Sequence, residues 1–554
     1  MKRTRGKKGR IQGRITPHKA LADVRELLGD APRSRDLLVE HLHRLQDHYG
    51  HLSHRHLLAL AIEMELPMAE VYETATFYHH FDVLKADENA PPELTVRVCE
   101  SLTCEMFGAA GLINQLGALT DPDRVRIQPV PCVGRCQAAP VAVVGTNPVE
   151  HARPETVTAA IKDGETVCPE PDAIRYADYR AQGGYKLLAD CRNGGYTPEQ
   201  VIDMLEQAQL RGLGGAGFPA GRKWRILRSQ PRPRLIALNI DEGEPGTFKD
   251  RYYLERDPHR FIEGTLIAAW AIEAEAIYIY LRDEYAGCRA LLEAELAALQ
   301  QDPPCPLPPV HLRRGAGAYI CGEESAMLES IEGKRGMPRL RPPYVAEVGL
   351  FNRPTLEQNM ETLHWVRDIV EKGPEWFTSR GRRGRKGLRS FSVSGRVQNP
   401  GVHLAPAGIS IRELIDEHCG GMLPGHEFYG YFPGGASGGI LPASLDDVPL
   451  DFDTLQPHGA FIGSAAVIVL SDRDSARALA LNAMRFFEDE SCGQCTPCRA
   501  GTAKAVKLME KPEWDRLLLE DLAQAMEDAS ICGLGQAAPN PLRCAMKYFP
   551  GEFS

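Results

Sequence analysis

Residues 211–224 read Arg-Gly-Leu-Gly-Gly-Ala-Gly-Phe-Pro-Ala-Gly-Arg-Lys-Trp and lie between a predicted helix at 199–210 and a predicted buried strand at 235–239. The glycines match G-x-G-x-x-G, a dinucleotide-binding pattern that normally follows a strand. Here a helix precedes the loop, so the pattern alone is weak evidence and a tight turn explains it equally well. Backbone without Cβ atoms nevertheless lets N–H groups approach a phosphate. The segment predicts an α/β domain with a nucleotide-sized loop.

Two further loops combine small residues with acids. The first, at 239–246, reads Asn-Ile-Asp-Glu-Gly-Glu-Pro-Gly and follows the predicted strand; the second, at 315–325, ends in Gly-Glu-Glu-Ser. Carboxylates repel phosphates, so these acids suit ribose or ribityl hydroxyls and a nicotinamide amide. Any single acid could instead cap a helix or lie in a solvated loop. Together, the three loops predict one nucleotide-binding pocket.

Cysteines near the C-terminus have the spacing of iron-sulfur ligands. Residues 490–498 read Glu-Ser-Cys-Gly-Gln-Cys-Thr-Pro-Cys, and a fourth cysteine follows at 532. A turn with C-x2-C-x2-C supplies three corners of a cubane cluster, and a distant cysteine supplies the fourth. The pattern predicts a [4Fe-4S] cluster held by Cys492, Cys495, Cys498 and Cys532.

A second cysteine group lies nearer the N-terminus. Cys99 and Cys104 follow one predicted strand, and Cys132 and Cys136 follow another. Paired loops at neighbouring strand ends can bring four thiolates to a [2Fe-2S] cluster. A four-cysteine zinc site or unligated thiols are the alternatives.

Composition limits the class of protein. The 554 residues carry a net charge of −10 and 43% hydrophobic residues, which gives no support to nucleic-acid binding. No apolar run reaches the length of a membrane span, and no secretory signal is visible. We therefore expect a cytoplasmic protein whose thiols stay reduced.

The order of these patterns predicts a multidomain α/β protein. We expect a basic disordered arm at 1–30, a helical bundle at 31–85, a compact α/β domain with four cysteines at 86–165, a long α/β nucleotide-binding domain at 166–378, a small β-rich domain with one helix at 388–472 and a helical [4Fe-4S] domain at 473–554.

Residues 185–550 resemble the NADH-binding flavoprotein subunit of respiratory complex I, through the motifs quoted above and those at 342–344 and 354–362. Residues 31–160 resemble its thioredoxin-like [2Fe-2S] partner subunit. Such a fusion resembles the diaphorase subunits of NAD-linked enzymes. Segments 35–42 and 486–492 look most similar to the β subunit of cytosolic molybdenum- or tungsten-dependent formate dehydrogenases.

The resemblance implies one FMN, NAD(H), one [4Fe-4S] and one [2Fe-2S] cluster. It also implies a thioredoxin-like [2Fe-2S] domain at 86–165, a Rossmann-like FMN- and NAD-binding domain at 166–378 and a β-grasp (soluble-ligand-binding) domain at 388–472. Glu244 and Glu324 would lie near the nicotinamide, as the residues closest to the catalytic step. Leu213, Ile226, Tyr344 and Gln358 depart from the arginine, phenylalanines and asparagine usual in complex I. Cofactor binding would fall to Gly212, Gly214, Lys223, Asn239, Asp241, Glu242, Tyr319, Gly322, Glu323, Tyr344 (against adenine), Asn359 and Thr362.

The implied function is hydride exchange between NAD(H) and FMN, followed by transfer of single electrons through the clusters. The expected partner is a molybdenum- or tungsten-containing formate dehydrogenase catalytic subunit with further iron-sulfur clusters, in a hetero-oligomer such as a dimer of heterodimers. An NAD-reducing hydrogenase or a complex I module would share every site. A zinc-bound scaffold protein is the alternative of another class.

Overall fold

The computed structural model describes residues 17–85 and 88–553, which form two compact units. The first unit comprises the described residues up to Pro91 together with Gly333–Arg335; the second holds the rest. Most of the predicted basic arm, residues 1–16, lies outside the described residues. The prediction of disorder through residue 30 is wrong for α1 (His18–Leu28), whose buried Ala20, Val24 and Leu28 form an apolar stripe.

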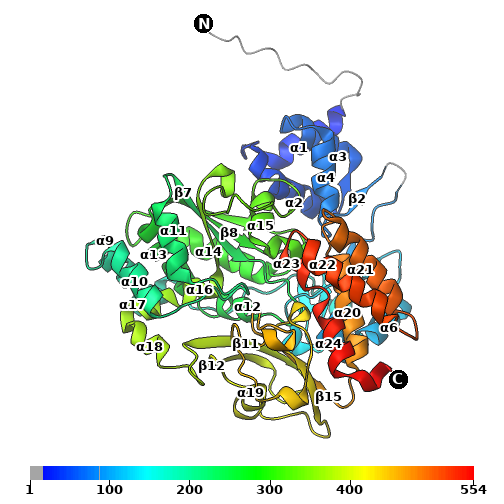
Figure 1. Cartoon of the computed structure of the whole chain (residues 1–554). Helices are drawn as coiled ribbons and strands as arrows, with labels where there is room; N and C mark the ends of the chain where they lie inside the picture. The colour runs from blue at the N-terminus through cyan, green and yellow to red at the C-terminus, as the bar shows by residue number, and fades with distance from the viewer. Residues whose placement is uncertain (1–16, 86–87, 554) are drawn as a thin grey trace. The chain divides into compact units, whose positions relative to one another are not determined.

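The first unit is helical (Figure 1). Helices α2 (Leu38–Tyr49) and α3 (His54–Glu63) pack with α1, and α4 (Met68–Phe77) packs on α2 and α3. The short parallel strands β1 (Leu52–Ser53) and β2 (Val83–Leu84) pair with each other. Leu38, Leu42 and Leu45 form an apolar stripe on α2 and are buried, which agrees with the helical bundle predicted at 31–85. These contacts form a small core of their own.

The second unit begins with a four-stranded sheet of order β4-β3-β5-β6. Strands β3 (Leu94–Cys99) and β4 (Val125–Val130) run parallel, whereas β5 (Ala142–Val144) and β6 (Asn147–Val149) form an antiparallel hairpin. Helices α6 (Ala109–Leu119) and α7 (Pro154–Asp163) pack on it. Because β3 and β4 are parallel neighbours, the loops after them lie at the same edge.

A second sheet is fully parallel, with the order β10-β7-β8-β9. Its strands are β7 (Arg234–Ile240), β8 (Ala274–Leu281), β9 (Val310–Arg314) and β10 (Thr355–Asn359). Figure 1 shows helices around it in green, among them α10 (Pro198–Gln207), α11 (Ala220–Ser229), α13 (Pro258–Ile272), α14 (Ala286–Gln301), α15 (Glu324–Ile331) and α16 (Met360–His364). Ligands bind such sheets at the carboxyl ends of the strands.

The third sheet has five strands in the order β12-β11-β15-β13-β14. They are β11 (Leu388–Gly395), β12 (Gly401–Pro406), β13 (Phe428–Phe432), β14 (Leu441–Pro442) and β15 (Ala466–Ser471), and α19 (Ile411–His418) is the helix among them. Ser410 begins α19 with a capping box in which Glu413 takes part. This is the small β-rich domain with one helix that the sequence predicts, and its sheet is mixed, with β11 antiparallel to β12 and parallel to β15.

The chain continues as helices α20 (Ala476–Asp489), α21 (Thr496–Met509), α22 (Arg516–Ala529), α23 (Gly533–Ala537) and α24 (Asn540–Tyr548), drawn orange to red in Figure 1. They pack on one another as a bundle. Within 17–85 and 88–553, no helix has both the length and the apolar composition needed to cross a membrane.

Candidate functional site

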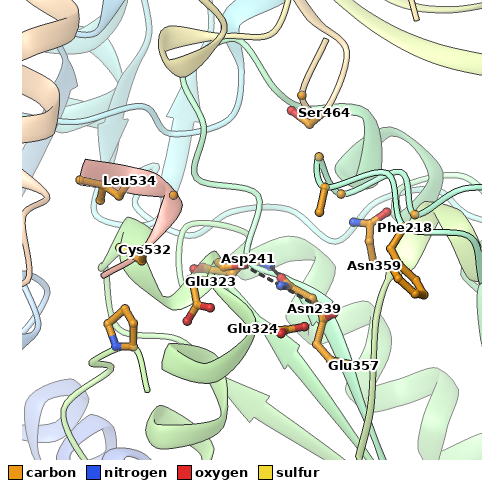
Figure 2. A pocket seen from close by; sticks show the side chains of 18 of the residues that line it. Phe218, Asn239, Asp241, Glu323, Glu324, Glu357, Asn359, Ser464, Cys532 and Leu534 are labelled. Atoms are coloured by element: carbon orange, nitrogen blue, oxygen red, sulfur yellow. Dashed lines mark hydrogen bonds between the residues drawn. The ribbon is translucent and has the colours of Figure 1, made fainter. Parts of the chain in front are cut away.

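A cavity of about 1130 Å³ lies at the carboxyl ends of β7 and β10, and its size accommodates a ligand larger than one nucleotide. Its wall contains every residue predicted to bind the flavin or NAD(H) except Thr362. Figure 2 shows Cys532 and Leu534 on one side of it and Phe218 and Asn359 on the other. The structure thus brings together segments more than 300 residues apart in the sequence.

The glycine-rich loop forms one wall. The Gly212 N–H donates to Phe218 O at 2.8 Å, and the Leu213 N–H donates to Thr362 Oγ1 at 2.9 Å. Thr362 therefore supports the loop from behind. A Cβ on Gly214 would lie 3.0 Å from Asn359 Cβ, so a side chain would crowd the loop against β10. This backbone can approach a bound phosphate closely.

The acids of the two other loops have different roles. Glu242 accepts from Asp250 N–H and Arg251 N–H at the start of α12 (Lys249–Leu254), and Glu323 caps α15 through Ser325 N–H and Ala326 N–H. Both therefore make the capping contacts that were the alternative to ligand binding, although both line the cavity. Their carboxylates order the loops that surround a ligand.

Two side-chain oxygens in the cavity wall find no hydrogen-bond partner among the described residues. They are Asp241 Oδ2 and Gln358 Oε1, and both are buried. Burial raises the pKa of Asp241 well above its usual value. Such orphaned groups are costly unless a ligand satisfies them. They are consistent with a hydroxyl- and amide-bearing ligand such as FMN.

Glu244 connects two domains. It accepts from Ser437 N–H at 2.7 Å and Ser437 Oγ at 2.8 Å, and from the Tyr319 hydroxyl. Burial raises the pKa of Glu244, whereas these hydrogen bonds lower it. Ser437 lies in η5 (Ala436–Gly438) of the five-stranded domain. The predicted nicotinamide residue thus holds that domain against the cavity.

Lys223 and Asn239 converge on Glu357, which lies in the 354–362 motif but was not predicted as a site residue. Lys223 Nζ lies 2.9 Å from Glu357 and 3.7 Å from Glu324, and these charges raise the Lys223 pKa although burial lowers it. Asn239 donates to Glu357 Oε1 at 3.3 Å and to Gly322 O at 2.9 Å. The cation therefore lies at the cavity wall with two acids around it.

The wall also contains residues that were not predicted. Phe218 (42% exposed) offers an aromatic ring to the cavity in addition to that of Tyr344, the predicted adenine contact, which is 56% exposed. Gly463 and Ser464 enter from the turn before β15. Their segment contains no titratable motif, so only the fold reveals them. The signal available for Phe218 was its place inside the glycine-rich loop.

The N-terminal cysteine set converges at the end of β3 and β4. Cys99 ends β3, Cys104 lies on α5 (Leu102–Met106), and Cys132 Sγ lies 3.3 Å from Cys136 Sγ. All four thiols are buried and free, and the Gly134 N–H donates to Cys132 Sγ at 3.4 Å. A group of buried soft donors on two loops fits a [2Fe-2S] cluster.

The C-terminal set also converges. Cys492 and Cys495 lie in the turn between α20 and α21, Cys498 lies in the first turn of α21, and Cys532 precedes α23. Burial, and to a lesser degree the nearby sulfurs of Cys495 and Cys492, raise the pKa of Cys498 to about 11. Cys532 also lines the cavity, so this thiolate set borders the predicted flavin site.

Comparisons with known proteins agree with this geometry. Four family models match: the Nuo51 FMN-binding domain at 205–368, the thioredoxin-like [2Fe-2S] ferredoxin at 24–165, the NADH-ubiquinone oxidoreductase-F iron-sulfur binding region at 478–554, and the SLBB domain at 390–441. They confirm the predicted fold class and the predicted cofactors: domains for FMN, NADH, [2Fe-2S] and [4Fe-4S] are present.

Whole proteins match as well. An F-type NADH-quinone oxidoreductase subunit of Rhizobium meliloti is 42% identical over 398 residues, covering 69% of this chain and 94% of that protein. Mitochondrial NADH dehydrogenase [ubiquinone] flavoprotein 1 of Dictyostelium discoideum is 39% identical, covering 75% and 91%. A solved NAD⁺-reducing [NiFe]-hydrogenase chain superposes with a TM-score of 0.82 at 31% identity, covering 94% of this chain and 92% of that one. The chain belongs to the family of NADH-binding flavoprotein subunits of NADH-quinone oxidoreductase.

Proposed function

We propose that this chain is the diaphorase subunit of a cytoplasmic NAD-dependent formate dehydrogenase. In this function it exchanges a hydride between NAD(H) and FMN and passes single electrons to or from a separate catalytic subunit. The observation that carries the diaphorase assignment is one cavity bordered by the glycine-rich loop, Glu244 and Cys532. A nicotinamide site, a flavin site and a cluster ligand meet there.

When bound, FMN supplies the chemistry that joins two-electron hydride transfer to one-electron steps. The protein supplies position and charge. The glycine-rich loop admits a phosphate, and Lys223 contributes a point charge to the wall beside Glu324 and Glu357. Glu244 holds the five-stranded domain over the cavity through Ser437, which restricts access of water to the reacting atoms.

The fused arrangement supports a partner other than a complete complex I. The match to the Rhizobium relative covers 94% of that protein but only 69% of this chain. This chain therefore carries additional residues, and the thioredoxin-like [2Fe-2S] domain at 24–165 is part of the same polypeptide here. The segments at 35–42 and 486–492 favour formate dehydrogenase among the fused enzymes. The catalytic partner would carry molybdenum or tungsten and further iron-sulfur clusters.

A second candidate is the diaphorase of an NAD-reducing hydrogenase. It is favoured by the likeness of 94% of this chain to a chain of the solved hydrogenase. Both candidates share the cavity and the two cysteine sets, so only the catalytic partner distinguishes them.

Anaerobic co-purification with native partners, followed by NAD⁺ reduction assays, tests the proposal. We expect the complex to contain FMN, iron and sulfide and to reduce NAD⁺ with formate. Reduction with hydrogen but not formate would transfer the assignment to the hydrogenase. Absence of flavin and of iron, with bound zinc in their place, would overturn the diaphorase assignment itself.

A further inference from the structure

Arg282 lies between the flavin cavity and the N-terminal cysteine set. It follows β8 directly and is only 4% exposed. Its Nη2 donates to Cys132 O at 2.7 Å, and its Nη1 donates to Glu242 O. One guanidinium group thus holds both the loop that carries Cys132 and the loop that borders the cavity.

The surrounding contacts fix the same two loops. Tyr285 donates its hydroxyl to Glu242 at 2.9 Å, and Arg282 lies over the Tyr285 ring at 5.1 Å. A Cβ on Gly134 would lie 2.3 Å from the Tyr285 hydroxyl oxygen, so the cysteine loop packs directly on this ring. Phe248, which follows the 239–246 loop, packs against Cys132 and Cys136 in one buried cluster. The contact between the two sites leaves no room for an intervening layer.

Charge is also concentrated here. Arg282 pairs with Glu284, with Nη2 at 2.7 Å and Nε at 3.1 Å from its carboxylate oxygens. Arg251 approaches from α12 and donates to Gly134 O at 2.9 Å, and Glu244 lies near Cys132 on the cavity side. One-electron reduction adds a negative charge to a cluster, and a buried cation beside its ligand favours that form because the low dielectric strengthens the attraction.

We propose that Arg282 is a positioning residue that raises the reduction potential of the [2Fe-2S] cluster and couples its loop to the flavin loop, while Glu284 moderates this effect. The inference rests on the proposed assignment of Cys99, Cys104, Cys132 and Cys136 as cluster ligands. It predicts effects of opposite sign when the two partners of one ion pair are neutralised separately.

The test is a potentiometric titration of the purified holoprotein, followed by the electron paramagnetic resonance signal of each cluster. Arg282→Gln should lower the reduced-to-oxidised ratio of the [2Fe-2S] cluster at a fixed potential by about tenfold, which for one electron is about 59 mV. Glu284→Gln should raise it. Arg282→Lys, which keeps the charge, should stay nearer the wild type than Arg282→Gln. The [4Fe-4S] signal should titrate as in the wild type in all three.

Arg234→Gln is the matched control. Arg234 is also buried (7% exposed) and also bonds backbone carbonyls, including Ile272 O at 2.8 Å, but it begins β7 and so lies at the opposite end of the sheet from Glu242. The Arg234→Gln variant should leave the reduction potential of the [2Fe-2S] cluster unchanged. If Arg282→Gln does not fold, Glu284→Gln alone decides through the sign of its shift.

Two results are to be distinguished. If the [2Fe-2S] cluster of Arg282→Gln and of Glu284→Gln titrates at the same potential as that of the wild type, the inference is overturned and the proposed function stays intact. A wild-type protein without any [2Fe-2S] signal overturns the ligand assignment, and the inference fails with it.

Discussion

At the scale of single residues, Glu244 shows how one carboxylate can join two domains at a site. Glu244→Gln replaces an acceptor of three hydrogen bonds with an amide that cannot accept them all. Hydrogen bonds to charged groups contribute about 1.5–3 kcal/mol. We expect kcat/KM for NADH to fall at least tenfold in a dye-reduction assay, while the FMN content stays near that of the wild type.

Glu347→Gln is the control for this prediction, since Glu347 lines the same cavity from its exposed rim and accepts from Tyr344 N–H at the longer distance of 3.3 Å. It should change kcat/KM little. Equal losses in both variants would show that any carboxylate at the cavity has the same effect, which contradicts a specific role for Glu244.

His364 gives a prediction about pH. Burial, together with the nearby positive charge of Arg260, lowers its pKa to about 3, whereas an unfolded histidine titrates near 6.5. Below pH 6.5 the unfolded chain therefore binds a proton that the native chain does not, so stability falls as pH falls from 6.5 toward 3. The loss is at most about 1.4 kcal/mol per pH unit from this group.

His364→Phe keeps a ring against Tyr253, whose centroid lies 4.1 Å away, and removes the titration. The thermal midpoint should then drop less between pH 7 and pH 5 than it does in the wild type. The exposed His54→Phe should leave that drop unchanged. An identical drop in the wild type and His364→Phe would contradict the assignment.

At the scale of elements, a close contact between α13 and α16 positions the cavity wall. A Cβ on Gly264 of α13 would lie 2.0 Å from Leu363 O of α16. Gly264→Ala should therefore force α16 away, at a cost of about 1–3 kcal/mol. Because Thr362 lies on α16 and Asn359 caps it, we expect a lower thermal midpoint and a lower FMN content.

Gly117→Ala is a suitable comparison, because Gly117 is in helix α6 and, apart from its chain neighbours and the backbone of its own helix, no described atom lies within 4 Å of the position that a Cβ would take there. Alanine is the better helix former by about 1 kcal/mol, so this variant should be neutral or slightly stabilised. Loss of flavin in Gly117→Ala as well would show that the effect of Gly264→Ala is not local.

Elements with a regular apolar pattern were predictable, and those shaped by the site were not. Strand β7 was expected at 235–239 and occupies Arg234–Ile240, because its residues are apolar and buried. Strand β10 was not predicted as a strand, since Glu357 and Gln358 interrupt any apolar run. Glu357 and Gln358 both line the cavity, so these two polar side chains face the ligand site and break the alternation of apolar residues by which a strand is recognised.

At the scale of the whole molecule, the sequence predicted the cysteine sets and the three loops of one wall, but not the opposite wall. The spacing of cysteines identifies metal ligands that are close in sequence. By contrast, Ser437 reaches Glu244, and Ser464 reaches Thr247, only because the five-stranded domain packs there. No local pattern encodes that approach. The same packing places the two cysteine sets on different sides of one cavity region, with Cys532 in its wall and Cys132 near Glu244.

If the two cysteine sets hold separate clusters, each can be removed without the other. Cys532→Ala should lose about four iron atoms per chain and the [4Fe-4S] signal, and Cys136→Ala about two and the [2Fe-2S] signal, with FMN retained in both. Cys532→Ala should also abolish NAD⁺ reduction by the native partner's substrate while NADH still reduces a dye. Cys532 borders the cavity, so we expect its cluster to be the first to exchange electrons with the flavin. Cys544→Ala, at a buried cysteine outside both sets, should keep all the iron. Iron and sulfide analysis with electron paramagnetic resonance measures each outcome, and the loss of both signals from either single substitution would contradict two independent sites.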